Sequence, residues 1–219
     1  MTTLVVGDLH GQHEIAMKAI KLANDNNWQL VFIGDYMDSF SRSIDDQVQT
    51  VRVVRDAIGT GLAIGLLGNH ELSYMYPFMR CGGYNSVKQI YMNNFIADFN
   101  TMFKPYYWAD GFLISHAGVS LELLELLEID LATYLESVNH FQIGYSRGGN
   151  VTTGGLYWCD WEYEFVPIPG ISQVVGHTRQ KGGVIAEKEG NYCIDVLEDS
   201  DRKYGLLLDN GMATVQEIV

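Results

Sequence analysis

The sequence predicts an α/β fold that carries its functional residues at strand ends. Short, continuous apolar runs recur along the chain, each followed by glycine or serine, which suits strands of a sheet covered on both faces. Segments of helical periodicity alternate with these runs through the first half of the chain, as in α/β folds. The runs are residues 4–6, 30–33, 64–67, 112–114 and 174–175.

The first predicted helix follows the first apolar run. Residues 13–24 place their apolar side chains on one face, and the polar run 24–27 ends the pattern. The residues of that face are Ile15, Ala19, Leu22 and Ala23.

A second helix is expected after Ser43. Asp46 lies three positions beyond this serine, in the spacing of a capping box. Gly59 is expected to end the helix. Its apolar stripe consists of Ile44, Val48, Val51 and Ile58.

The second half of the chain predicts two insertions and a β-rich tail. A helix is expected over 86–103, before Pro105, and helical spacing of leucine and acidic residues recurs over 121–138, followed by the loop 144–150. These insertions flank the polar motifs, so we expect them to select the substrate. The tail predicts strands over 184–186, 192–196, 204–208 and 212–219, with a turn at 209–211.

Length and composition predict one α/β domain over residues 1–219. There is no apolar stretch of the ~20 residues that a membrane span requires, and no secretory signal pattern, so a cytoplasmic location is expected. The three cysteines are widely spaced and are expected to be reduced thiols. The sequence leaves the oligomeric state open.

The formal net charge of −13 bears on the partners of the chain. Non-specific binding to nucleic acid depends on cationic contacts with phosphate, so stable nucleic-acid binding is not expected. The same charge favours binding of divalent cations, although acidic composition alone is weak evidence.

Five polar motifs follow the five apolar runs and predict a site for two divalent metal ions. Asp8 and His10 lie two residues apart in one loop and can face one ion, and Asp35 can bridge two ions ~3.5–4 Å apart. The second ion would be completed by Asn69, His116 and His177. None of the motifs contains cysteine, which argues against a structural zinc site. The motifs are residues 7–11, 34–38, 68–71, 115–118 and 176–178.

The distribution of histidines supports the metal interpretation. Of the six histidines in the chain, four fall inside these motifs at predicted strand ends, whereas His13 and His140 do not. A single histidine at such a position is commonly a hydrogen-bonded structural residue, but four together at strand ends favour a shared site. The four are His10, His70, His116 and His177.

The five motifs, taken in order, resemble the signature of the calcineurin-like metallophosphoesterases, in particular their phosphoprotein phosphatase branch. That signature reads G-D-x-H-G, G-D-x-x-D-R, G-N-H-E, H-(G/A)-G and a final G-H or A-H, and the resemblance spans residues 7–178. It implies a four-layer α-β-β-α sandwich with helical insertions at the active-site rim. It further implies two divalent ions, with Mn²⁺ the first choice and iron or zinc the alternatives.

The resemblance also implies roles for individual residues. Asp8, His10 and Asp35 would bind the first metal, and Asp35 would share the second with Asn69, His116 and His177. A hydroxide bridging both metals would attack phosphorus. His70 would protonate the leaving oxygen, and Asp38 would orient its imidazole.

The chain departs from this signature at two positions. Ser39 stands where the family has an arginine that grips the substrate phosphate, and the segment Trp158-Cys159-Asp160 lacks the arginine that many small members have shortly after a tryptophan. A serine cannot imitate the bidentate guanidinium. The candidate replacements are Arg42, Arg147 and Arg179.

Four functions are compatible with the sequence. The leading one is hydrolysis of phosphomonoesters, on phosphoproteins or small molecules. The second is symmetrical hydrolysis of dinucleoside polyphosphates, and the third is phosphodiester cleavage, which the negative charge disfavours. The fourth is a metal-bound module without catalysis; the presence of both His70 and Asp38, which metal binding does not require, argues against it.

Overall fold

Two five-stranded mixed sheets pack face to face in the computed structural model, which describes residues 1–76, 78–198 and 201–219. The first sheet has the order β10-β9-β1-β2-β3, with β1, β2 and β3 parallel. Its strands are β1 (Thr3–Val6), β2 (Gln29–Phe32), β3 (Ile64–Gly65), β9 (Tyr204–Asp209) and β10 (Met212–Glu217).

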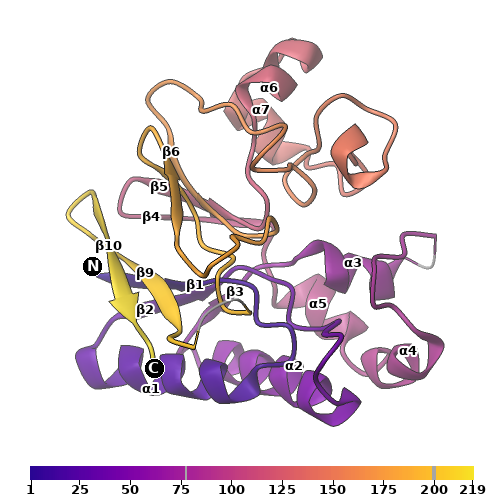
Figure 1. Ribbon diagram of the computed structural model, residues 1–219, viewed down its shortest axis with the longest axis vertical. Helices are drawn as coiled ribbons and strands as arrows, with labels where there is room; N and C mark the ends of the chain where they lie inside the picture. The colour runs from indigo at the N-terminus through magenta and orange to yellow at the C-terminus, as the bar shows by residue number, and fades with distance from the viewer. Residues whose placement is uncertain (77, 199–200) are drawn as a thin grey trace.

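The second sheet has the order β4-β5-β6-β8-β7, with β5, β6 and β8 parallel and both edge strands antiparallel to their neighbours. In Figure 1 it lies above the first sheet. Its strands are β4 (Tyr106–Ala109), β5 (Phe112–Ser115), β6 (Ser172–Val175), β7 (Ala186–Lys188) and β8 (Asn191–Cys193).

The helices lie outside the two sheets, so the predicted α/β sandwich is confirmed. Helices α1 and α2 run along the outer face of the first sheet, and α6 and α7 lie beyond the second (Figure 1). The helices are α1 (His13–Asn26), α2 (Ile44–Gly59), α3 (Asn69–Met75), α4 (Ser86–Met92), α5 (Ile96–Thr101), α6 (Leu121–Leu127) and α7 (Leu131–Glu136), with a 3₁₀ turn at Tyr145–Arg147. Among the described residues, no helix combines the length and apolar character needed to cross a bilayer.

Alternation along the buried strands divides the core into layers. Leu4 and Val6 of β1 pack toward α1 and α2, whereas Val5 between them packs against the second sheet. In β5, Ile114 faces the first sheet and Leu113 faces outward, toward residues that include Leu123 of α6. The continuous apolar runs therefore reflect strands that are buried on both faces, as predicted.

Each insertion forms two helices, where the sequence predicted one helix over 86–103 and helical spacing over 121–138. The expected helix over 86–103 is wrong as one element, because α4 ends at Met92 and α5 begins at Ile96. Asn93 and Asn94, which have weak helix propensity, separate them. The segment 121–138 also forms two helices, because Glu128 adopts a left-handed φ of 54° and Asp130 caps the next helix through the Thr133 amide.

Strand β4 was not predicted, although a local signal for it exists. It pairs with β5 through the turn Asp110-Gly111, whose residues have φ of 51° and 86°. Asp-Gly is among the strongest hairpin signals. In the tail, β9 and β10 agree with prediction, whereas β7 begins two residues later than expected, at Ala186.

The predicted capping box at the start of α2 is present and yields a stability prediction. The Ser43 side chain accepts a hydrogen bond from the Asp46 amide at 3.1 Å, and the Asp46 carboxylate accepts one from the Ser43 amide. We expect Ser43→Ala to lower the free energy of unfolding by about 1 kcal/mol, because the Asp46 amide loses its side-chain acceptor. Urea denaturation measures the change, with the exposed Ser86→Ala as control. An unchanged midpoint for Ser43→Ala would contradict this role.

Candidate metal centre

The five polar motifs lie together at the carboxyl ends of parallel strands from both sheets. In the first sheet they follow β1, β2 and β3, and in the second they follow β5 and β6. Hydrogen bonds join these ends: the Gly176 amide donates to the His116 carbonyl at 2.7 Å, and the His177 amide donates to the Asp8 carboxylate at 3.0 Å. The structure therefore brings the motifs to one rim, where α/β folds bind ligands.

A first group of ligand-type atoms is formed by His10, Asp35 and His70, which lie within 4.8 Å of one another. His10 Nδ1 lies 2.7 Å from the Met37 carbonyl, which can only accept, so this nitrogen carries the proton. Nε2 of His10 is then the acceptor nitrogen, 3.9 Å from Asp35 Oδ2. A backbone carbonyl that fixes the tautomer in this way is typical of metal-binding histidines.

A second group is formed by Asp35, His116 and His177, also within 4.8 Å. The oxygen of Asn69 joins it, with Oδ1 lying 2.8 Å from His116 Nε2 and 3.0 Å from His177 Nδ1. His116 Nδ1 faces the Ile33 carbonyl at 3.0 Å, which makes Nε2 its acceptor nitrogen. Asp35 belongs to both groups and so lies between them.

Three acceptor atoms at the second group repel one another unless a cation lies among them. His116 Nε2 faces Asn69 Oδ1 and lies 3.4 Å from Asp35 Oδ2, and all three atoms are acceptors. Burial lowers the pKa of His116 and lowers that of His177 well below its usual range, so both rings are neutral. Neutral imidazole, carboxylate and amide oxygen are a donor set that fits a divalent cation such as Mn²⁺ or Zn²⁺.

Two motif glycines leave room for the carboxylates. A Cβ atom at Gly68 would lie 2.1 Å from Asp35 Oδ1, and one at Gly176 would lie 2.0 Å from Asp8 Oδ1. No larger residue fits either position unless the carboxylate moves. The glycines of these motifs are therefore required by the side chains they contact.

Four side chains of the site stand on left-handed backbone. The φ angles of His10, Asp35, Asp38 and His177 are 41°, 53°, 66° and 64°. Non-glycine residues seldom adopt this conformation, and the surrounding structure must hold them in it. Their concentration at one rim is typical of a functional site.

Asp195 is a member of the site that sequence reasoning missed. It is buried beyond the end of β8, and burial together with the charge of Asp35 raises its pKa to about 7. Burial, Asp195 and Asp35 likewise raise the pKa of Asp8 well above its usual value. Asp195 follows the run Tyr192–Ile194 directly, without the glycine or serine that begins the other motifs, so the rule that identified those motifs did not find it. This excess of buried carboxylates also favours a cation.

Glu71, the last residue of the third motif, supports the backbone of the site. Its buried carboxylate accepts hydrogen bonds from the amides of Asp35 and Tyr36, both at 2.8 Å, and of Gly68 at 2.9 Å. Burial and the nearby Asp35 raise its pKa to about 7. Glu71 therefore ties the second motif to the third, a role that the sequence pattern did not reveal.

His70 and Asp38 form a hydrogen-bonded pair beside the first group. His70 Nδ1 donates to Asp38 Oδ2 at 2.9 Å, which leaves Nε2 on the side of Asp35, 3.8 Å from Oδ2. Burial opposes protonation of His70, but the charge of Asp35 and the hydrogen bond to Asp38 raise its pKa to about 9.

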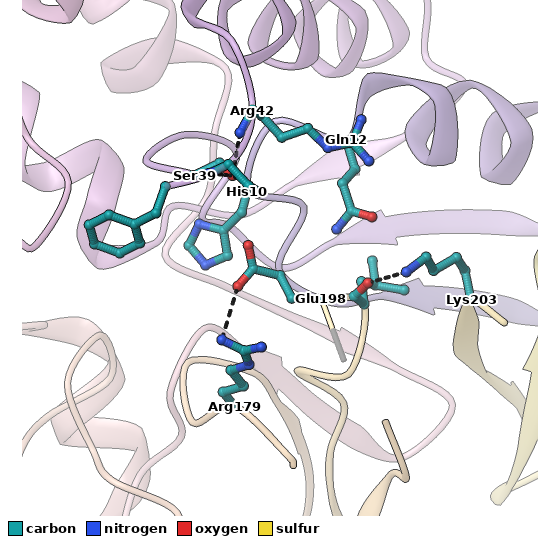
Figure 2. A pocket seen from close by; sticks show the side chains of 10 residues that line it. His10, Gln12, Ser39, Arg42, Arg179, Glu198 and Lys203 are labelled. Carbon is teal, nitrogen blue, oxygen red and sulfur yellow. Dashed lines mark hydrogen bonds and ion pairs between the residues drawn. The ribbon is translucent and has the colours of Figure 1, made fainter. Parts of the chain in front are cut away.

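Ser39, which stands in place of the family arginine, shapes the loop that carries Arg42. Its hydroxyl accepts a hydrogen bond from the Arg42 amide at 3.2 Å. Arg42 and Arg179 line opposite sides of a cavity of about 330 Å³ that begins at His10 (Figure 2). The two guanidinium groups also contact acids, Arg42 with Glu14 at 2.7 Å and Arg179 with Glu198 at 3.6 Å.

Arg147, the third candidate, contacts the loop that follows β6. Its guanidinium pairs with Asp160 at 2.9 Å, donates to the Thr178 hydroxyl at 2.9 Å and lies 3.4 Å from the His177 carbonyl. Asp160, in the segment that lacks the second family arginine, is thus the partner of Arg147. Arg147 holds the main chain beside His177.

Comparisons with known proteins agree with this geometry. The sequence profile of the calcineurin-like phosphoesterases matches residues 1–179. No curated protein sequence matches the chain significantly.

Among solved structures, a cold-active protein-tyrosine phosphatase of a psychrophilic Shewanella species is 17% identical, with a TM-score of 0.65, and the match covers 100% of this chain and 80% of that one. A protein serine/threonine phosphatase from Saccharomyces cerevisiae is 14% identical, with a TM-score of 0.50, and the match covers 99% and 79%. At these identities the likeness shows the fold alone.

The matched segment contains all five motifs, and the fold around them is the sandwich expected from them. The chain therefore belongs to the calcineurin-like phosphoesterase family.

Proposed function

We propose that the chain hydrolyses phosphomonoesters at a centre of two divalent metal ions. The observation that carries this proposal is the position of Asp35, whose carboxylate belongs to two adjacent groups of ligand-type atoms, with the His70–Asp38 pair alongside. A carboxylate shared between two ions is a feature of two-metal hydrolases.

The proposed ligands follow the two groups with one change: Asp8 takes the place of His70, which is assigned to proton transfer. Asp8, His10 and Asp35 would hold one ion, and Asp35 would share the other with three residues. These three are Asn69, His116 and His177. When bound, two divalent ions supply charge neutralisation for the phosphate and activate water as a nucleophile at neutral pH. Mn²⁺ is the ion proposed, with iron or zinc as the alternatives, since oxygen and imidazole nitrogen donors suit all three.

His70 would deliver the proton to the leaving oxygen. Its Nδ1 proton is engaged with Asp38, so Nε2, on the side of Asp35, is the nitrogen that would hold and release the transferred proton. Asp38 has no exposed side-chain surface, so it acts on the substrate only through the imidazole, whose ring orientation and tautomer it fixes.

The arginines would bind the phosphate or the group attached to it. Arg42 and Arg179 line the cavity beside His10, and Arg147 lies next to His177. A guanidinium at either position can donate two parallel hydrogen bonds to phosphate oxygens, as Ser39 cannot.

The same cavity favours hydrolysis of dinucleoside polyphosphates as a second candidate function. Lys203 joins Arg42 and Arg179 in its lining, so three cations line this cavity in a protein of net charge −13 (Figure 2). Several cations around one cavity suit a substrate with more than one phosphate. Turnover of diadenosine tetraphosphate, compared with that of a phosphoserine peptide, separates the two functions.

The central experiment measures bound metal and then turnover. The purified chain is analysed for its metal content, loaded with Mn²⁺, and assayed on phosphoserine, phosphotyrosine, nucleotide, dinucleotide and aryl diester substrates. Turnover of a phosphomonoester supports the leading proposal. Metal binding without turnover of any phosphate ester would favour a binding module and overturn it.

The role of His70 gives one prediction. We expect His70→Asn to retain both metals and to lower kcat by at least ~100-fold, because proton transfer to the leaving group contributes ~10²–10⁴-fold. Metal analysis and steady-state kinetics check both parts. His13→Asn, at a histidine of α1 outside the motifs, is the control. Unchanged activity would remove His70 from the mechanism.

The shared carboxylate of Asp35 gives a second prediction. Asp35→Asn is expected to weaken Mn²⁺ binding by at least ~10-fold, because an amide oxygen carries no negative charge to offset two cations. Titration calorimetry and elemental analysis measure the affinity and the occupancy. The matched control is Asp45→Asn, at an exposed residue of α2. A fully loaded Asp35→Asn protein would contradict the bridging role.

A further inference from the structure

Lys88, on α4 of the insertion after the third motif, is a buried cation directed at the active-site rim. Only 4% of its surface is exposed, and its ammonium donates to Asp38 Oδ1 and to the Gly83 carbonyl, both at 2.9 Å. Lysine is seldom buried, since desolvation of the ammonium is unfavourable unless it is paired. An apolar side chain would satisfy packing alone, so the position of this charge calls for an explanation.

The carboxylate of Asp38 is held on both oxygens. Oδ1 accepts from Lys88 and from the Tyr74 hydroxyl at 2.5 Å, and Oδ2 accepts from His70 Nδ1. The Asp38 amide in turn donates to Gln47 Oε1 at 3.0 Å. With both oxygens occupied, the carboxylate cannot rotate without breaking a charge-assisted bond, and the imidazole hydrogen-bonded to it is fixed as well.

The insertion packs closely against this pair. Gly83 adopts a φ of 87°, and a Cβ atom there would lie 2.9 Å from the Cβ of Asp38. Helix α4 begins three residues later, at Ser86, and Asn85 Oδ1 caps it by accepting from the Lys88 amide at 2.9 Å. The close approach of Gly83 to Asp38 therefore brings the insertion, and with it the Lys88 ammonium, to the pair.

We propose that Lys88 is a positioning residue for proton transfer: by holding Asp38, it keeps His70 Nε2 directed at the leaving oxygen. This inference rests on the proposed function. It assigns the insertion a part in the chemistry, in addition to any part in substrate selection. Lys88 touches no reacting atom and acts through Asp38 and His70.

The test compares leaving groups of different basicity. We expect Lys88→Met in the Mn²⁺-loaded protein to lower kcat about tenfold on phenyl phosphate, part of the ~10²–10⁴-fold contribution of general acid catalysis. On 2,4-dinitrophenyl phosphate, whose leaving group departs without a proton, the loss is expected to stay below about twofold. A role in folding or metal binding alone would lower both rates equally.

Two variants calibrate this result. Asn85→Ala removes the cap of α4 but keeps the ammonium, and it is expected to treat both esters alike. His70→Asn is expected to show the same selectivity as Lys88→Met with a larger loss on phenyl phosphate. If Lys88→Met does not fold, Lys88→Gln, which removes the charge but keeps a polar side chain, makes the same test. Equal losses on both esters, or no loss, would overturn the inference.

A spectroscopic measurement tests the positioning without turnover. In the full chain with diamagnetic Zn²⁺ added, imidazole ¹H–¹⁵N spectra report the His70 Nδ1 proton, which is assigned by its absence in His70→Asn. We expect this proton to exchange with solvent faster in Lys88→Met and unchanged exchange in Asn85→Ala. Unchanged exchange in Lys88→Met overturns the inference, whereas a wild-type protein inactive on all phosphate esters overturns the proposed function itself.

Discussion

The buried carboxylate of Asp35 is the group around which the rim is organised. It lies 2% exposed, with Oδ1 accepting from the His70 amide at 3.0 Å and Oδ2 facing three imidazole rings. A buried anion needs compensating partners, and here these are a backbone amide, histidines and the cations proposed to bind. Glu71, a second buried acid, binds the amide of Asp35 itself. The absence of a Cβ at Gly68 leaves room for the Asp35 carboxylate.

The two sheets contribute unequally to this arrangement. The first supplies the residues after β1, β2 and β3, including both members of the His70–Asp38 pair, whereas the second supplies His116 and His177. Contacts between sheets set their relative position: His116 Nδ1 reaches the carbonyl of Ile33, and the His177 amide reaches Asp8. The apolar layer between the sheets, which includes Val5, therefore does more than stabilise the fold, because it aligns the two halves of the site.

The insertion after the third motif supplies the supporting residues. Tyr74 and Lys88 hold Asp38, and Cys81 Sγ accepts from Asn69 Nδ2 at 3.2 Å, which turns Asn69 Oδ1 toward the histidines. From sequence, the insertion was expected to select the substrate. Its described residues also make contacts that orient Asn69, a proposed metal ligand, and, through Asp38, His70, the proposed general acid. Supporting contacts of this kind commonly determine ligand geometry and reactivity.

The order of strands and motifs could be predicted from sequence, because strand burial and motif position leave local patterns: an apolar run, then glycine and a polar residue. These patterns predict one group of side chains. Its members are Asp8, His10, Asp35, Asn69, His116 and His177. What the chain alone left undecided were the interactions between distant segments. Three of these interactions leave no periodic signal along the chain. Lys88 reaches Asp38, Arg147 pairs with Asp160, and Asp195 joins the buried acids. Packing of the insertions and alignment of the two sheets decide them, because these contacts depend on the relative positions of elements and not on the spacing of residues within one.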